Sequence, residues 1–221
     1  MDKREKYFIV LSGLFTGLLV LANIIAVKLI TISIGGKEFF VPAAVLAYAL
    51  TFTITDSISE IWGKERTNWL VFTGFLTSVI VALLIKLAIN ISPAPFWQNQ
   101  QQFADILGAN FRITIAGMIA YLISQYHDVW SFHLLKKYSN GKMLWLRNNV
   151  STAVSQLLDT TIFITIAFYG VIPNLTSMII SQYLIKIIIA LIDTPIVYGL
   201  VYMIKRDFSS KTLRKFERSI K

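Results

Sequence analysis

The sequence predicts an all-α fold: a polytopic membrane protein with a bundle of six transmembrane helices and both termini in the cytoplasm. The 221 residues are 55% hydrophobic and have a mean hydropathy of +0.63, which is too apolar for an ordinary soluble domain. Apolar runs long enough to cross a bilayer recur along the chain. Basic residues gather on one side of these runs, as in the cytoplasmic loops of membrane proteins.

About 20 apolar residues span the hydrocarbon, so we expect helices at 8–34, 43–62, 68–91, 111–132, 147–170 and 176–204. They form a single transmembrane domain over 1–221. The first run is too long for a signal-peptide core and lacks a cleavage pattern, so we expect it to be retained. The segment 92–110 is rich in proline and aromatic residues. We expect it at the outer interface, as a cap over an outward-facing cavity or as an anchor at headgroup level.

The distribution of the 21 Lys and Arg residues gives the orientation. Most lie in the amino terminus, in the loops after the second and fourth helices, and in the tail 205–221, whereas the outer connections hold only Lys37 and Arg112. This asymmetry predicts that both termini are cytoplasmic. It also explains the formal net charge of +9 without a nucleic-acid partner. The basic tail would contact anionic lipid headgroups or dock a partner.

The run from Leu146 to Gly170 is apolar but carries polar side chains on one helix face, namely Asn148, Thr152, Ser155, Gln156 and Asp159. A charged residue near the centre of a membrane helix costs roughly 2.5 to 3.5 kcal/mol on insertion scales. An acid among aligned amides and hydroxyls therefore indicates a functional face.

Other helices add to this polar set. Asp56 and Glu60 lie one turn apart on the second helix, and two such acids need a cation, a donor-rich ligand or a shared proton. The first, fourth and sixth helices contribute Asn23, Lys28, Gln125, Asp128, Lys186 and Asp193. We expect the long side chain of Lys86 to reach water, so Lys86 is not counted among the charges inside the membrane. Among the charged residues that are left there, acids outnumber bases. We expect a shared polar interior, which either holds the helices together by pairing or faces a ligand, a cation or a proton relay.

Five strings carry a family resemblance: NIIAVK, TDSISEIWGK, AYLISQYHDVWSF, LWLRNNVSTAVSQLLDTTIF and YLIKIIIALIDTPIVYG. Together they cover nearly the whole membrane portion and resemble the queuosine precursor transporter family, also labelled a vitamin uptake transporter family. The resemblance implies import of 7-deazaguanines, such as the 7-cyano or 7-aminomethyl form, across the cytoplasmic (inner) membrane. It implies no cofactor and no metal.

By position in these strings, the resemblance implies substrate-binding roles for Asn23, Asp56, Glu60, Gln125, Asp128, Gln156, Asp159, Lys186 and Asp193. A carboxylate can accept the adjacent N–H and amine of a deazaguanine, and Gln, Asn or Lys can donate to its carbonyl. Gate or secondary positions are Lys28, Arg112, Arg147, Asn148 and Asn149. Arg147 would be an inner gate or a lipid anchor. Candidates for ring stacking are Tyr121, Trp130, Phe163 and Tyr183.

A rival interpretation makes the chain the substrate-binding subunit of an importer driven by a separate ATPase. An intramembrane enzyme is disfavoured, because His127 and His133 lie on different helix faces and no HExxH or GxSxG pattern is present. The absence of cysteine excludes disulfides and thiolate chemistry. A facilitator and a proton symporter stay equally open, as does a homo-oligomer.

Overall fold

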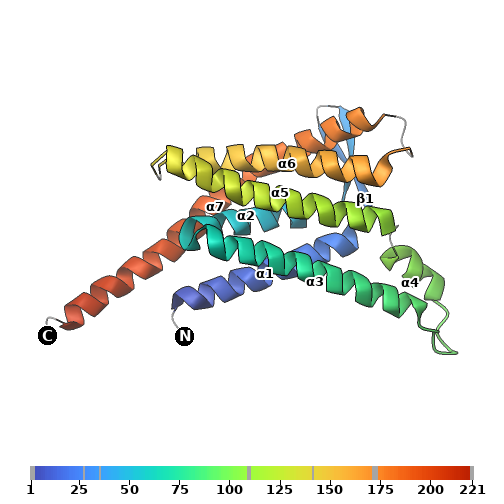
Figure 1. Ribbon diagram of the computed structural model, residues 1–221, viewed down its shortest axis with the longest axis horizontal. Coiled ribbons are helices and arrows are strands. Elements are labelled where there is room, and N and C mark those ends of the chain that lie inside the picture. The colour runs from blue at the N-terminus through green and yellow to red at the C-terminus, as the bar shows by residue number, and fades with distance from the viewer. Residues whose placement is uncertain are drawn as a thin grey trace.

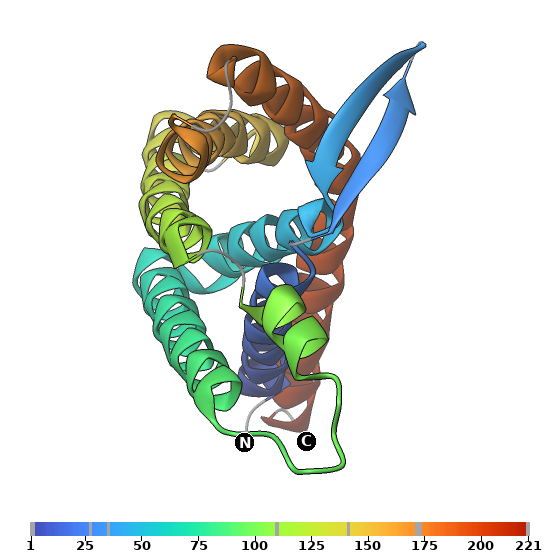
Figure 2. The same ribbon diagram turned by 90° about the vertical axis from the view of Figure 1, so that its right-hand side faces the viewer.

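The computed structural model describes residues 3–26, 28–34, 36–108, 111–140, 142–170 and 174–219. The elements in chain order are α1 Lys3–Ile25, β1 Leu29–Ile34, β2 Lys37–Pro42, α2 Val45–Trp62, α3 Lys64–Asn90, α4 Gln100–Leu107, α5 Phe111–Tyr138, α6 Leu144–Phe168 and α7 Leu175–Ser219. The long helices run along one axis of the molecule (Figure 1). Viewed along that axis, α2 lies in the middle of the bundle (Figure 2), where it contacts α1, α3, α5 and α7.

The surface of the bundle is apolar and much of its interior is polar. Large apolar side chains such as Leu83, Ile192 and Met203 are exposed, whereas Asp56 and Gln125 are buried. Among the described residues, four helices are long and apolar enough to cross a membrane: α1, α3, α6 and the Leu175–Arg206 part of α7. An apolar outer surface around buried polar groups is the reverse of a soluble core, and the chain is a multi-pass membrane protein.

Helices form over the stretches expected at 43–62, 68–91, 111–132, 147–170 and 176–204, with shifted ends. Gly63 makes the turn between α2 and α3 with φ 87°, a left-handed conformation that suits glycine, so α3 begins earlier than expected. The last helix does not stop before the basic tail but continues to Ser219. Because an arginine- and lysine-rich segment has good helix propensity, it extends the helix it follows.

The expected first helix at 8–34 is wrong in its second half. The helix α1 ends at Ile25, and β1 and β2 form an antiparallel hairpin in which Ile34 pairs with Lys37. Alternating β-branched residues in β1 favour a strand, and Gly36 in the turn has φ 78°. Val41 of the hairpin packs against α2 and α7. The hairpin projects to one side of the bundle (Figure 2) and lies at the end away from the chain termini (Figure 1).

The segment 92–110 contains the short helix α4, which contacts α3. Gln100 Nε2 donates to the carbonyl of Ile89 at 2.7 Å, and the rings of Trp97 and Phe103 pack edge to face. Phe96 is 88% exposed. Such an exposed aromatic would suit either a cap or an interfacial anchor, so both predictions stay open.

Side chains of α1 and α5 pack closely against Gly74 of α3. A Cβ atom there would lie 2.7 Å from Phe15 Cε1 and 2.8 Å from Tyr121 Oη, which itself donates to the carbonyl of Val71. We expect Gly74→Ala to destabilise the protein by about 1 to 3 kcal/mol, as overpacking does in other cores. The matched control is Gly17→Ala in α1, where nothing lies within 4 Å of the added atom. Equal unfolding temperatures of the two variants in detergent would contradict this.

Candidate functional site

Buried polar side chains meet where α2, α5, α6 and α7 face one another. Helical periodicity puts them on the inward faces, and the set comprises Thr53, Asp56, Ser124, Gln125, Asp128, Thr152, Ser155, Gln156, Asp159, Gln182 and Asp193. Buried polar groups are costly in an apolar surrounding unless they are paired. This cluster is therefore the part of the bundle that packing alone does not explain.

Asp159 on α6 is the best-connected acid of the cluster. Lys186 Nζ on α7 donates to its Oδ2 at 2.6 Å. The Tyr48 hydroxyl on α2 and the Ser124 hydroxyl on α5 donate to Oδ1 at 3.1 and 3.3 Å. The Lys186 ammonium also lies 5.5 Å from the centre of the Tyr48 ring, a cation–π distance. One carboxylate thus links four helices.

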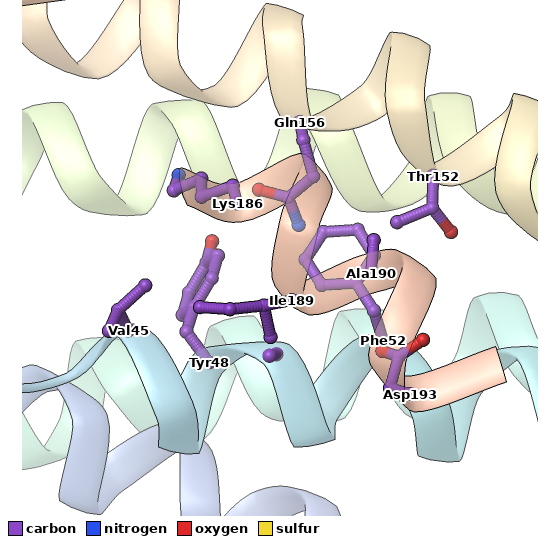
Figure 3. A pocket seen from close by; sticks show the side chains of 10 residues that line it. Val45, Tyr48, Phe52, Thr152, Gln156, Lys186, Ile189, Ala190 and Asp193 are labelled. Atoms are coloured by element: carbon purple, nitrogen blue, oxygen red, sulfur yellow. The ribbon is translucent and has the colours of Figure 1, made fainter. Parts of the chain in front are cut away.

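A pocket opens beside this ion pair (Figure 3). Its wall on α2 is apolar and aromatic, and polar groups from α6 and α7 stand across it; the lining is Val45, Tyr48, Ala49, Phe52, Thr152, Gln156, Lys186, Ile189, Ala190 and Asp193. Figure 3 shows Gln156 extending from α6 toward Phe52. The free space for a water-sized sphere is about 10 Å³, room for about one water molecule. The pocket is too small for a larger ligand unless side chains or helices move.

Several buried atoms at the cluster are unsatisfied. Within the described residues, no hydrogen-bond partner is found for Asp56 Oδ1, for either oxygen of Asp128, for the amide of Gln125 or for Gln156 Oε1. Leaving a buried polar atom unpaired costs about 1 to 3 kcal/mol. Such atoms in one place indicate a site for a polar ligand or for protons.

One carboxylate oxygen of Asp56 and one of Asp193 have neutral hydrogen-bond partners. Thr152 Oγ1 donates to Asp56 Oδ2 at 3.3 Å, and Thr53 Oγ1 donates to Asp193 Oδ2 at 3.0 Å. Both bonds cross between helices, from α6 to α2 and from α2 to α7. Hydroxyls orient these carboxylates without neutralising their charge.

Glu60 sits apart, at the end of α2 nearest the chain termini. It accepts from Lys136 at 2.8 Å, from Arg147 at 3.0 Å and from Lys205 at 2.8 Å. These cations come from α5, α6 and α7, so the Glu60 cluster joins four helices. Arg147 is 1% exposed and lies 5.2 Å from the Phe132 ring. Such burial favours the inner gate over the lipid anchor, because an anchor must reach headgroups.

Asn23, Lys28 and Arg112 are not part of the polar cluster or of the pocket lining. Asn23 is exposed on α1 and its Nδ2 donates to Ser78 Oγ on α3 at 3.3 Å. Lys28 is exposed in the connection before β1, so the expectation that it lies in a membrane helix is wrong. Arg112 is in the first turn of α5, and its side chain lies outside the described part of the structure. None of the three is brought to the polar cluster by a described contact.

The two asparagines that follow Arg147 differ in their surroundings. Asn148 is buried, and no partner for its Oδ1 is found among the described residues. Asn149 donates to the carbonyl of Trp145 and accepts from Thr194 of α7 at 3.1 Å. Asn149 therefore links α6 to α7 near the Glu60 cluster, and Asn148 is the inward-facing member.

Tyr48 and Phe52 line the pocket but were not among the predicted ring-stacking residues. They lie eight and four residues before Asp56, on the same face of α2, which is the signal that could have identified them. The residues expected instead were Tyr121, Trp130, Phe163 and Tyr183, and none of these lines the pocket. Tyr121 packs toward α3, and Trp130 is half exposed on the outer surface.

A multi-pass apolar bundle that holds a small pocket beside buried polar groups suits a membrane transporter, and comparison with known proteins supports this class. A family model described as "Putative vitamin uptake transporter" matches residues 42–200. The chain belongs to that family, as the sequence strings led us to expect.

Two curated relatives carry the same printed name, "Probable queuosine precursor transporter". The relative from Bacillus subtilis (strain 168) is 33% identical over 163 residues, which are 72% of this chain and 71% of the relative. The relative from Haemophilus influenzae is 27% identical over 161 residues, which are 71% of this chain and 66% of that relative. No solved structure matches the chain significantly.

Proposed function

We propose that this chain imports queuosine precursors, 7-deazaguanines such as 7-cyano- or 7-aminomethyl-7-deazaguanine, through the pocket between α2, α6 and α7. The observation that carries the proposal is the lining: two aromatic rings, Tyr48 and Phe52, face an amide and a carboxylate, Gln156 and Asp193. A flat base with polar edges needs both a stacking surface and edge partners. The names of the relatives support this substrate class.

The polar partners suit the edges of a deazaguanine. The ring N–H and the exocyclic amine are adjacent donors, which one carboxylate accepts as a pair. Asp193 and Asp159 are the acids at the pocket, and Gln156 or Lys186 supplies a donor for the base carbonyl. Lys186 and Asp159 already pair with each other at 2.6 Å. A base that enters would exchange part of that pairing for its own hydrogen bonds.

In the membrane we propose six spans, with α2 and α5 crossing beside the four apolar helices. The first turn of α1 and the last turns of α7 lie at the same end of the molecule (Figure 1), as an even number of spans requires. The basic residues at that end indicate that this end faces the cytoplasm. We propose that the protein spans the inner membrane. The substrate-binding subunit of an ATPase-driven importer is the alternative, and the comparisons give it no support.

The proposal is tested by uptake in cells that lack their own route for the precursor. Cells that produce the protein should accumulate labelled 7-aminomethyl- or 7-cyano-7-deazaguanine well above cells with an empty vector. Unlabelled precursor should compete, and adenine should not, because adenine lacks the adjacent N–H and amine. Accumulation equal to the empty vector, with the protein present in the membrane, would overturn the proposal.

Two substitutions at Tyr48 distinguish the contribution of its ring from that of its hydrogen bond to Asp159. We expect Tyr48→Leu to raise the half-saturating precursor concentration about threefold to tenfold, since aromatic pairs contribute about 0.5 to 1.5 kcal/mol beyond area burial. Tyr48→Phe keeps the ring and loses only the 3.1 Å hydrogen bond, so it should be affected less. Equal defects in Tyr48→Phe and Tyr48→Leu would show that the hydroxyl, which both variants lack, matters and the ring does not.

A further inference from the structure

The buried acids of the bundle fall into two groups by charge compensation. Glu60 has three cationic partners and Asp159 has one. For Asp56, Asp128 and Asp193, no ion pair is found within the described residues. The side chains are 2%, 0% and 6% exposed, respectively. The second group is therefore buried as deeply as the first but lacks a counter-charge.

These three acids also lie near one another. Asp56 on α2 faces Asp128 on α5. Asp193 on α7 accepts a hydrogen bond from Thr53, which lies one turn before Asp56. From α6 the facing groups are hydroxyls, those of Ser151, Thr152 and Ser155. The nearest cations of α6 and α7, Arg147 and Lys186, are already engaged by Glu60 and Asp159. No ion pair from α1 or α3 to these acids is found in the described part of the chain.

Three neighbouring carboxylates at this depth cannot all carry a charge. Burial of an unpaired ion costs several kcal/mol, and like charges a few ångströms apart add to that cost. A proton on one acid turns its oxygen into a donor for the next acid. That arrangement would satisfy Asp56 Oδ1 and one oxygen of Asp128, which have no partner among the described residues.

A second observation points in the same direction. The Gln125 side chain, one turn before Asp128, is fully buried, and neither of its amide atoms has a partner among the described residues. Gln156 Oε1 is unpaired in the same sense, and Gln156 lines the pocket together with Asp193. Unsatisfied donors and acceptors thus lie one turn from Asp128 and in the pocket wall that holds Asp193.

We propose that Asp56 and Asp128 form a proton-binding site that couples precursor import to proton entry; this rests on the proposed function. A proton from the outer solution binds a carboxylate oxygen as an O–H group when the site faces outward. It leaves to water from that oxygen when the site faces inward, and one proton enters with each substrate. Asp193 belongs to both the acid group and the pocket lining, which gives substrate binding a direct effect on the charge of the pair.

Purified protein in liposomes tests the coupling. With one proton per neutral substrate, an outside solution one pH unit more acidic should give about tenfold accumulation of labelled precursor. Replacing sodium by potassium should have no effect. Accumulation that follows a sodium gradient, or uptake that ignores the pH difference, overturns the inference while leaving the proposed function intact. Absence of any exchange between labelled and unlabelled precursor would instead overturn the proposed function.

The assignment to Asp56 and Asp128 is tested by binding rather than transport. Precursor affinity of the detergent-solubilised protein should change with pH. In Asp128→Asn and in Asp56→Asn this pH dependence should be lost, so that the precursor affinity is the same at every pH. Asp105→Asn, in the exposed helix α4, is the control and should behave as the unaltered protein. An unchanged pH dependence in both variants overturns the assignment, as does complete loss of binding, which would make these acids substrate contacts.

Discussion

Asp159→Asn is expected to reduce precursor uptake at least about tenfold at equal protein level. The substitution keeps the shape of the side chain but removes the charge that Lys186 contacts at 2.6 Å. Lys186 is then a mostly buried ammonium without its partner, which costs far more than an exposed one. The substitution also weakens the oxygen of residue 159 as an acceptor for the Tyr48 hydroxyl. Initial rates in cells, normalised to the amount of protein in the membrane, measure the effect.

Two further variants distinguish substrate recognition from charge balance. Asp105→Asn removes an exposed acid outside the bundle and should leave uptake unchanged. The double variant Asp159→Asn with Lys186→Gln restores neutrality in the pocket without restoring the acid. We expect it to recover stability but not uptake. Uptake that returns to normal in the double variant would reduce the role of Asp159 to neutralising Lys186.

Glu60→Gln is expected to be the most destabilising single change in the polar interior. It removes a carboxylate that contacts both Lys136 and Arg147, and Arg147 is 1% exposed. Breaking a buried pair by removing one partner costs about 3 to 5 kcal/mol, because the other charge stays buried. The change should appear as a large fall in unfolding temperature in detergent and as low yield of folded protein.

The control for this prediction is Lys205→Gln. Lys205 contacts the same carboxylate at 2.8 Å but is 52% exposed, and an exposed ion pair contributes about 1 kcal/mol or less. A second control adds Arg147→Met to Glu60→Gln, since apolar replacement of both partners often restores stability. If Lys205→Gln were as destabilising as Glu60→Gln, the buried Arg147 would not be the reason.

Much of the helical fold was predictable because membrane helices have a strong sequence signal. Apolar runs of sufficient length identified α2, α3, α5, α6 and α7, and only the ends of these helices shifted. The hairpin was missed because hydropathy does not separate a strand from a helix. The alternation of Ile30, Ile32 and Ile34 before Gly35 and Gly36 was the available signal, since a Gly-Gly pair between alternating apolar residues is typical of a hairpin.

The site was predictable in its residue types but not in its pairings. A 3.6-residue period places Gln156 and Asp159 on one inward face, and the structure puts Gln156 at the pocket and Asp159 beside it. The period does not say how helices are rotated against one another. For that reason Asn23 was predicted to lie with the substrate-binding residues, although it contacts Ser78 on α3. The three cationic partners of Glu60 could not be predicted for the same reason.

The central claim is that this chain alone carries a 7-deazaguanine across the membrane through the α2, α6 and α7 pocket. The most direct test is uptake of labelled 7-aminomethyl- and 7-cyano-7-deazaguanine into liposomes that contain only the purified protein, without ATP. We predict saturable uptake of at least one of them, and at least about tenfold slower uptake with Asp159→Asn. No uptake above protein-free liposomes, by protein shown to be folded, would contradict the account.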